Sequence, residues 1–261
     1  AIEKYPSIIN YCNNKDDVSN AIKWARKNEV SFRIRSGCHN YEGFSTGNDL
    51  LVIDVSRINS IFIDEDKNYV KLGGGVRNRE IYEALGKQGY PFPGGGCPTV
   101  GVSGLILGGG WGYSTRLFGL SCDTLIELEL VNYNGEVMIA SEKENSDLFW
   151  ACRGAGGGNF GVIVSMKFAL PNKKQMATLI NGDFNNCDIE ETIKLISTWQ
   201  EMYKNLDKRF NGKMSIYNSK ENGRGVKFTA LLYGDEKEAN EILEPLKRVS
   251  SNSFIKMEYG T

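Results

Sequence analysis

The sequence predicts an α+β protein with two regions, residues 1–172 and 173–261. Helix-like segments with apolar residues at spacings of three and four alternate with short strand-like runs along the whole chain. The segment PNKKQ at 171–175 has the composition of a linker, and the elements after it follow the order βαββαβ. With 261 residues the chain is long enough for one large domain or two modest ones.

The first region combines helices with several short strands. Its first helix begins near Asp17, where an acidic start precedes apolar residues at helical spacing, and a second covers 78–86. The strand-like runs are FRIR (32–35), LLVIDV (50–55), IFI (61–63), YVKL (69–72) and VIVSMKFAL (162–170). Residues 124–140 predict a hairpin, because Asn134 and Gly135 suit a type I′ turn. The segment 146–153, SDLFWACR, is helix-like.

The second region predicts one antiparallel sheet backed by two helices. Its strands are expected at 178–184, 213–218, 226–233 and 253–259, and its helices at 189–204 and 236–249. Ile193, Ile196 and Tyr203 are expected on the buried face of the first of these helices. The alternating Tyr217, Phe228 and Leu232 are interpreted as core residues and not as a ligand cage.

Composition excludes several classes of function. The chain has 31 basic and 32 acidic residues, so its net charge of −1 gives no reason to expect nucleic acid or a membrane surface as partner. It has no apolar run of about 18 residues and no signal-like segment. A single histidine and six cysteines without CxxC spacing argue against a metal site. We expect mostly free thiols and a cytoplasmic location, with secretion left open.

Glycine usage indicates where the chain approaches a ligand. Of the 30 glycines, 21 lie between Gly73 and Gly161, in runs interleaved with helix-like and strand-like segments. Glycine runs are entropically costly, which favours ordered loops against a large flat ligand over a flexible linker. His39, in RIRSGCHNYEG, and Cys97, in PFPGGGCPTVG, are nucleophiles presented by two of these loops. Residues 35–37 predict a backbone nest for an anion such as pyrophosphate, or a plain strand-to-loop turn.

These motifs resemble the berberine-bridge-enzyme-like FAD-linked oxidases. RSGCHNYEGFS, GGGCPTVGVSGLILGGGWGYSTRLFGLSCDTL and SDLFWACRGAGGGNFGVIV occur here in the family's order, over about residues 5–170. The resemblance implies a PCMH-type FAD-binding domain of two α/β subdomains over 1–172, followed at 173–261 by the first part of a substrate domain whose sheet roofs the flavin. It also implies two covalent bonds to FAD, from His39 to the 8α-methyl carbon and from Cys97 to ring carbon 6. Imidazole nitrogen and thiolate sulfur are nucleophiles suited to an electron-poor ring.

The family's other cofactor-binding positions map onto residues in the same motifs. They are Arg35, Ser36, Gly37, Cys38, Asn40, Ser45, Thr99, Val100, Gly101, Ser103, Gly104, Gly108, Gly110, Asn159, Gly161 and Val162. Two positions depart from the pattern, since many relatives have glycine at Cys38 and the berberine bridge enzyme has histidine at Leu105. The family implies hydride transfer from an alcohol or sugar substrate to FAD, with O₂ or another acceptor reoxidising it.

Other interpretations are weaker or stay open. GxGxxG at 156–161 lies after a helix and before a strand, the reverse of a Rossmann unit, and 101–105 lacks the second glycine of a GxSxG motif. Glu127 and Glu129 alternate with apolar residues and are expected on the solvated face of a strand. Two alternatives remain. One is a UDP-N-acetylenolpyruvoylglucosamine reductase with noncovalent flavin, and the other is a silent flavin-binding protein, that is, one without catalytic activity. We expect a truncated chain whose catalytic base lies beyond Thr261, and within the given sequence Tyr113 is the one candidate for that role.

Overall fold

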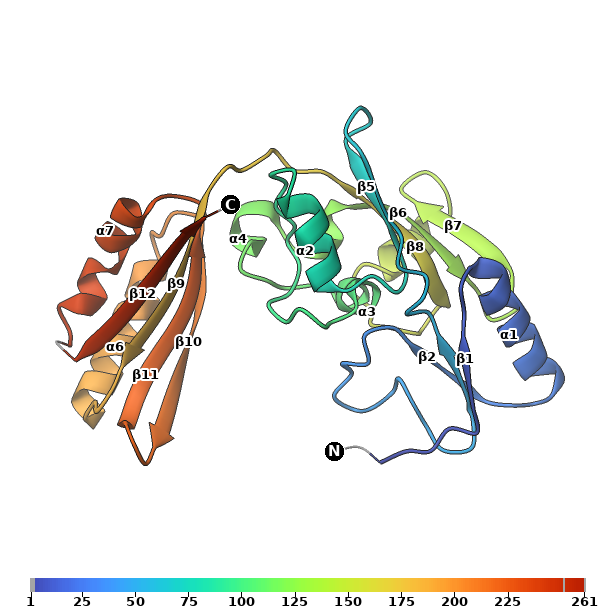
Figure 1. The fold of residues 1–261 in the computed structure, drawn as a ribbon, viewed down its shortest axis with the longest axis horizontal. Helices are drawn as coiled ribbons and strands as arrows, with labels where there is room; N and C mark the ends of the chain where they lie inside the picture. Colours follow the sequence, from blue (N-terminus) through green and yellow to red (C-terminus); the bar gives the residue numbers. More distant parts are fainter. Residues whose placement is uncertain (1–2, 251, 261) are drawn as a thin grey trace. The chain divides into compact units, whose positions relative to one another are not determined.

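The computed structural model describes residues 3–250 and 252–260 and has the α+β architecture that the sequence predicts. The chain forms two compact units (Figure 1). One unit comprises residues up to 112 together with 118–172, and the other comprises 113–117 together with the residues from 173 onward. The short segment Tyr113–Leu117 therefore groups with the second unit, although it lies within the first region of the sequence.

A small parallel sheet begins the first unit. Its strands β1 (Ile8–Tyr11), β2 (Phe32–Arg35) and β3 (Leu51–Asp54) are arranged in the order β1-β3-β2. Helix α1 (Lys15–Lys27) connects β1 to β2, and the side chain of Asn14 caps it by accepting a hydrogen bond from the Asp17 N–H. The apolar face of α1 packs with the sheet into one core, and residues of β6 and β8 join that core.

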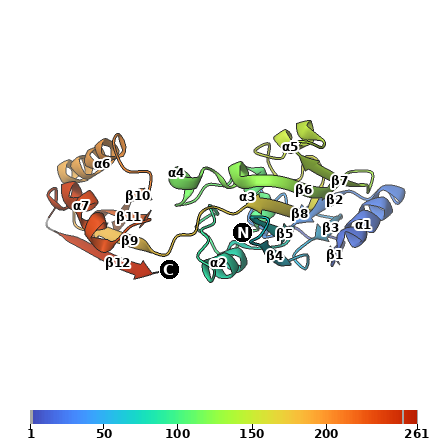
Figure 2. The ribbon, with the colours of Figure 1, turned by 90° about the horizontal axis from the view of Figure 1, so that it is seen from above.

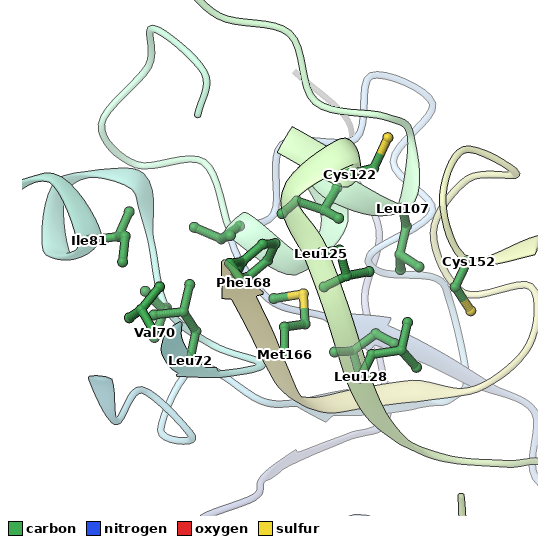
Figure 3. Close-up of a cluster of buried hydrophobic side chains, with 14 of the residues drawn as sticks. Val70, Leu72, Ile81, Leu107, Cys122, Leu125, Leu128, Cys152, Met166 and Phe168 are labelled. Carbon is green, nitrogen blue, oxygen red and sulfur yellow. The ribbon is translucent and has the colours of Figure 1, made fainter. Parts of the chain in front are cut away.

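A five-stranded antiparallel sheet completes the first unit. Its order is β4-β5-β8-β6-β7, and the strands are β4 (Ile61–Asp64), β5 (Tyr69–Gly73), β6 (Leu125–Val131), β7 (Val137–Ser141) and β8 (Val162–Ala169). The accompanying helices are α2 (Asn78–Gly86), α3 (Val102–Leu107), α5 (Ser146–Ala151) and the 3₁₀ helix η1 (Ser121–Thr124). Helix α4 (Thr115–Phe118) lies largely in the 113–117 segment that groups with the second unit. Figure 3 shows Ile81 of α2 and Leu107 of α3 in one buried cluster with Leu72 and Phe168 of the sheet.

The second unit has the predicted order βαββαβ. Strands β9 (Ala177–Phe184), β10 (Phe210–Ser219), β11 (Gly223–Leu232) and β12 (Ser253–Gly260) form an antiparallel sheet in the order β10-β11-β9-β12. Helices α6 (Ile189–Tyr203) and α7 (Glu236–Lys247) lie on the same face of this sheet (Figure 2). The opposite face is not covered by either helix.

Two expectations about side-chain orientation, those for Ile193 and Tyr217, need correction. Leu195 and Trp199 are buried on α6 and Tyr203 packs against the same core as predicted, whereas Ile193 is 58% exposed and was wrongly placed on the buried face. Phe228 is a core residue as predicted. Tyr217 instead lies on the open face of the sheet, since it is one residue out of phase with Phe228 in the β10–β11 register.

Strand β6 carries the predicted alternating glutamates, but its pairing with β8 has two register shifts, at Leu125/Glu127 and at Glu129/Leu130. Glu127 and Glu129 form ion pairs with Lys167 and Lys15, both at 2.8 Å. A register shift between Leu125 and Glu127 interrupts the pairing with β8 and leaves Ile126 exposed.

Candidate flavin site

The glycine-rich segments predicted to bind the cofactor gather in the first unit. Ser36, in the loop after β2, and Ser103, in α3, both donate hydrogen bonds to the carbonyl oxygen of Gly74, at 3.0 and 2.7 Å. The N–H of Gly156 donates to the carbonyl oxygen of Leu107 at 2.7 Å, which joins the 154–161 loop to the end of α3. Segments distant in the sequence are therefore bonded to one another here.

The loop after β2 and the loop before α3 approach at two glycines. A Cβ atom added to Gly37 would lie 2.1 Å from the backbone nitrogen of Gly101, and one added to Gly101 would lie 2.6 Å from the backbone nitrogen of Gly37. No larger residue fits at either position without moving the main chain. These two glycines hold the backbones of the two loops in direct contact.

This contact brings together the two predicted nucleophiles. His39 Nε2 lies 2.8 Å from Thr99 Oγ1, and Cys97 Sγ lies 3.5 Å from the same oxygen. All three side chains are exposed. The pKa of the Cys97 thiol is lowered, first by the hydrogen bond from the Thr99 side chain and then by backbone N–H groups of Thr99 and Val100, which outweigh partial desolvation. A low-pKa, exposed thiol is the reactive form of cysteine.

Two residues that the sequence analysis did not select hold the Cys97 loop in place. Asn78, fully buried at the start of α2, donates from Nδ2 to the carbonyl oxygens of Cys97 at 2.9 Å and of Gly95 at 3.2 Å. The Tyr82 hydroxyl donates to the same Gly95 oxygen at 2.7 Å. A buried asparagine on the apolar face of a predicted helix, with Ile81 and Leu85, was the available signal for this role.

The guanidinium of Arg35 is bound by a buried carboxylate of the protein itself. Its Nε lies 2.5 Å from Asp54 Oδ2, in an ion pair with only 19% and 4% of the two side chains exposed. The other carboxylate oxygen of Asp54 accepts the Ser56 N–H at 2.8 Å. The guanidinium therefore fixes the end of β2, from which the His39 loop begins.

The main chain around His39 fits a phosphate-bearing ligand. The N–H groups of Gly37, Cys38 and His39 donate to no other described residue, and Cys38 has φ of 59°, in the left-handed region. Consecutive unbonded N–H groups with such a residue form a nest, two positions further along the chain than the one predicted at 35–37. A Cβ atom added to Gly104 would meet nothing within 4 Å, so protein packing does not require glycine there. These features suit FAD, which would place its pyrophosphate against backbone N–H groups.

The remaining predicted positions line the same loops or support them. Asn40 accepts the Phe44 N–H at 3.1 Å, and Asn159 donates to the Ala155 carbonyl at 2.7 Å, so both side chains shape their own loops. Val162 is buried in the core shared by the two sheets. The others lie in the loop before β3, in the Cys97 loop, just after α3 and directly before β8, and they are Ser45, Val100, Gly108, Gly110 and Gly161.

The other cysteines differ from Cys97 in burial or setting. All six are free thiols, as expected, and four of them are buried. Burial raises the pKa of Cys12 to about 12 and that of Cys152 to about 11. Within the described residues there is no cluster of three or more metal-ligating side chains. No helix in the described part of the chain is long and apolar enough to cross a membrane.

Comparison with known proteins identifies the family. Residues 6–141 match the FAD binding domain family, and the chain belongs to it. Its relatives include FAD-linked oxidoreductases and berberine-bridge-enzyme-like proteins, the class that the motifs around His39 and Cys97 resemble. The chain is 38% identical over 256 residues to the FAD-linked oxidoreductase YgaK of Bacillus subtilis, which covers 96% of this chain and 55% of that protein.

Solved structures of this class have the same fold. The BBE-like 1 protein of Physcomitrella patens superposes with a TM-score of 0.89 at 27% identity, covering 98% of this chain and 55% of that one. The glucooligosaccharide oxidase of Acremonium strictum, which has a 6-S-cysteinyl, 8α-N1-histidyl FAD, gives a TM-score of 0.86 at 25% identity, with 97% of this chain and 53% of that one covered. The chain spans about half the length of the relatives it matches.

Proposed function

We propose that the whole protein is an oxidase that transfers hydride from an alcohol carbon of a small hydroxylated molecule to FAD bound through both His39 and Cys97, with O₂ as the acceptor. The observation on which this depends is that His39 and Cys97, 58 positions apart in the sequence, share Thr99 Oγ1 as a hydrogen-bond partner. When bound, the flavin accepts the hydride and passes its electrons to oxygen.

The protein's part in this chemistry is to hold the cofactor. The loops after β2 and before α3 present both nucleophiles from backbones fixed by Gly37 and Gly101. Unbonded N–H groups at 37–39 would hold the pyrophosphate. The noncovalent reductase alternative gives no role to an exposed, low-pKa cysteine beside a histidine, so it is the weaker hypothesis.

The open face of the second unit's sheet has a pocket whose polar lining suits a hydroxylated substrate. A pocket of about 400 Å³ is lined there by Asn181, Gly182, Asp183, Lys213, Ser215, Lys227, Phe228, Thr229 and Phe254. The Tyr217 hydroxyl donates to Asp183 Oδ1 at 2.6 Å, leaving the other carboxylate oxygen able to accept from a ligand hydroxyl. Such a set of donors and acceptors beside an aromatic ring is suited to a sugar or sugar alcohol more than to an apolar alkaloid.

Two measurements test the proposal. The purified protein is precipitated with acid, and peptides containing His39 and Cys97 are analysed by mass spectrometry, where flavin mass on both is expected. Oxygen consumption is then measured with mono- and oligosaccharides and with aromatic alcohols. Colour released to the supernatant would refute covalent attachment. Flavin retained on both peptides with no turnover of any hydroxylated compound would favour the silent binder.

A further inference from the structure

We infer that the Thr99 hydroxyl prepares both nucleophiles for flavin attachment, by fixing the tautomer of His39 and stabilising the thiolate of Cys97 through one continuous hydrogen-bond chain. This inference rests on the proposed function, because it concerns how the two bonds to FAD form. Thr99 acts here as a positioning residue.

The directions of the hydrogen bonds follow from the donors available. A threonine hydroxyl has one proton to donate and two lone pairs. If His39 Nε2–H donates to Thr99 Oγ1 at 2.8 Å, the hydroxyl proton is free to be donated to Cys97 Sγ at 3.5 Å. This direction leaves the lone pair of the imidazole on Nδ1, to which no described group is hydrogen-bonded.

The same direction also favours the reactive form of the cysteine. Sγ accepts from Thr99 Oγ1–H, and a thiolate is a much better acceptor than a thiol. No charged side chain forms an ion pair or hydrogen bond with Cys97 in the described part of the chain, so the hydroxyl and nearby backbone N–H groups are what favour the anion. The opposite direction, with Nε2 accepting, would place the His39 proton on Nδ1 and block that nitrogen.

The local structure fixes the hydroxyl in this place. Thr99 follows Pro98, whose carbonyl accepts the Arg79 N–H at 3.0 Å, and precedes Val100, whose carbonyl accepts the Asn78 N–H at 3.0 Å. Helix α2 therefore anchors both neighbours of Thr99. The Gly37–Gly101 contact then sets its distance from the His39 loop.

The test compares Thr99→Val, which removes the hydroxyl at nearly constant shape, with Thr99→Ser, which keeps it. Thr198→Val is the matched control, because no described group bonds its hydroxyl and it lies on α6. All are produced as the full chain, with and without riboflavin supply. In flavin-free protein, iodoacetamide labelling of Cys97 is followed against pH by peptide mass, which separates it from the other exposed thiol, Cys38.

For Thr99→Val we expect the labelling midpoint of Cys97 to rise by about one pH unit, so that labelling at pH 7 slows about tenfold. Thr99→Ser and Thr198→Val should follow the wild type. Because His39 is the only histidine, ¹⁵N NMR of the imidazole reads its tautomer directly. The wild type should have the proton on Nε2, and this preference should be lost in Thr99→Val. In protein made with riboflavin, covalent flavin should fall at least about tenfold in Thr99→Val alone.

The outcomes separate this inference from the proposed function. An unchanged labelling midpoint and unchanged ¹⁵N shifts in Thr99→Val would overturn the inference even if wild-type protein carries flavin on both residues. Equal defects in Thr99→Ser and Thr99→Val would also overturn it, since the effect would then come from shape and not from the hydroxyl. Wild-type protein without covalent flavin, but with the expected midpoint and tautomer changes, would refute bicovalent attachment and leave the hydrogen-bond chain supported.

Discussion

Substituting Gly37 by alanine should separate the two nucleophile loops. The added Cβ would lie 2.1 Å from Gly101 N, and an ordinary contact begins at about 3.4 Å, so the backbones must move apart by about 1.3 Å. The same shift would lengthen the His39–Thr99 hydrogen bond from 2.8 Å to about 4.1 Å, which is beyond hydrogen-bonding range. Overpacking of this kind costs about 1–3 kcal/mol, or about 2–12 °C in Tm for a unit of this size.

Thermal unfolding by circular dichroism measures the stability of the Gly37→Ala variant, and intact mass measures its covalent flavin. Gly86→Ala is the control, because its Cβ would meet nothing within 4 Å and alanine favours a helix by up to about 1 kcal/mol. We expect Gly37→Ala to lose stability and both flavin bonds, and Gly86→Ala to lose neither. A Gly37→Ala protein with wild-type Tm and full flavin content would show that the loops do not depend on this contact.

Three further substitutions test other parts of the structure. Gly104→Ala should leave the stability of flavin-free protein unchanged or raise it, because the added Cβ would meet no protein atom within 4 Å. The same variant should bind FAD more weakly when binding is followed by fluorescence quenching. An unchanged affinity for FAD would mean that the flavin does not lie against Gly104. Arg35→Met leaves the Asp54 carboxylate buried without its partner and should cost about 3–5 kcal/mol in urea unfolding, whereas a loss under about 1 kcal/mol would contradict the buried pair. The hydrogen bond from Arg209 lowers the pKa of Glu238, so this pair stabilises the fold above the unfolded pKa, and the stabilisation is lost as the pH falls below about 4.5. Arg209→Met should therefore reduce the fall of the urea midpoint between pH 7 and about pH 3.5. An unchanged fall in the variant would exclude the Arg209–Glu238 pair as a source of acid sensitivity.

Local patterns in the sequence were sufficient for most elements of the fold. The β6–β7 hairpin forms where Asn134 and Gly135 predicted it, but its turn is not type I′, because Gly135 has φ of 76° whereas Asn134 does not have the positive φ that this type also requires. The Gly135 N–H donates to the Asn132 carbonyl oxygen at 2.9 Å, so the turn spans 132–135. The order βαββαβ in the second unit was readable because each helix and strand has its own hydrophobic period. Strand β1 was not predicted, because its four residues are mostly exposed and it is defined by parallel pairing with β3, about 40 positions away.

Orientation was predicted less well than element type. Along α6 several apolar residues compete for the buried face, and packing against the sheet selects Leu195 and Trp199 over Ile193. Tyr217 is in a strand with polar and apolar residues on both faces, so its direction depends on the register with β11. Neither choice is set by spacing within the segment alone.

For the candidate site, the sequence identified the nucleophiles but not what joins them. His39 and Cys97 were recognisable from their motifs, whereas the position of Thr99 between them depends on a contact across 60 residues that only the fold creates. The glycine run at 73–75 shows the same limit. A Cβ added to Gly74 would lie 2.0 Å from the Ile163 carbonyl oxygen, so this glycine serves packing between strands and not ligand approach.

Glycine in this chain therefore has two separable roles, and the difference explains how the site is built. At Gly37, Gly74 and Gly101 the missing side chain lets main chains touch, which is a property of the folded protein without any ligand. At Gly104 the missing side chain faces open space, which protein packing alone does not explain. Because the first group holds the two nucleophile loops in contact, it also sets the position of Thr99 between His39 and Cys97.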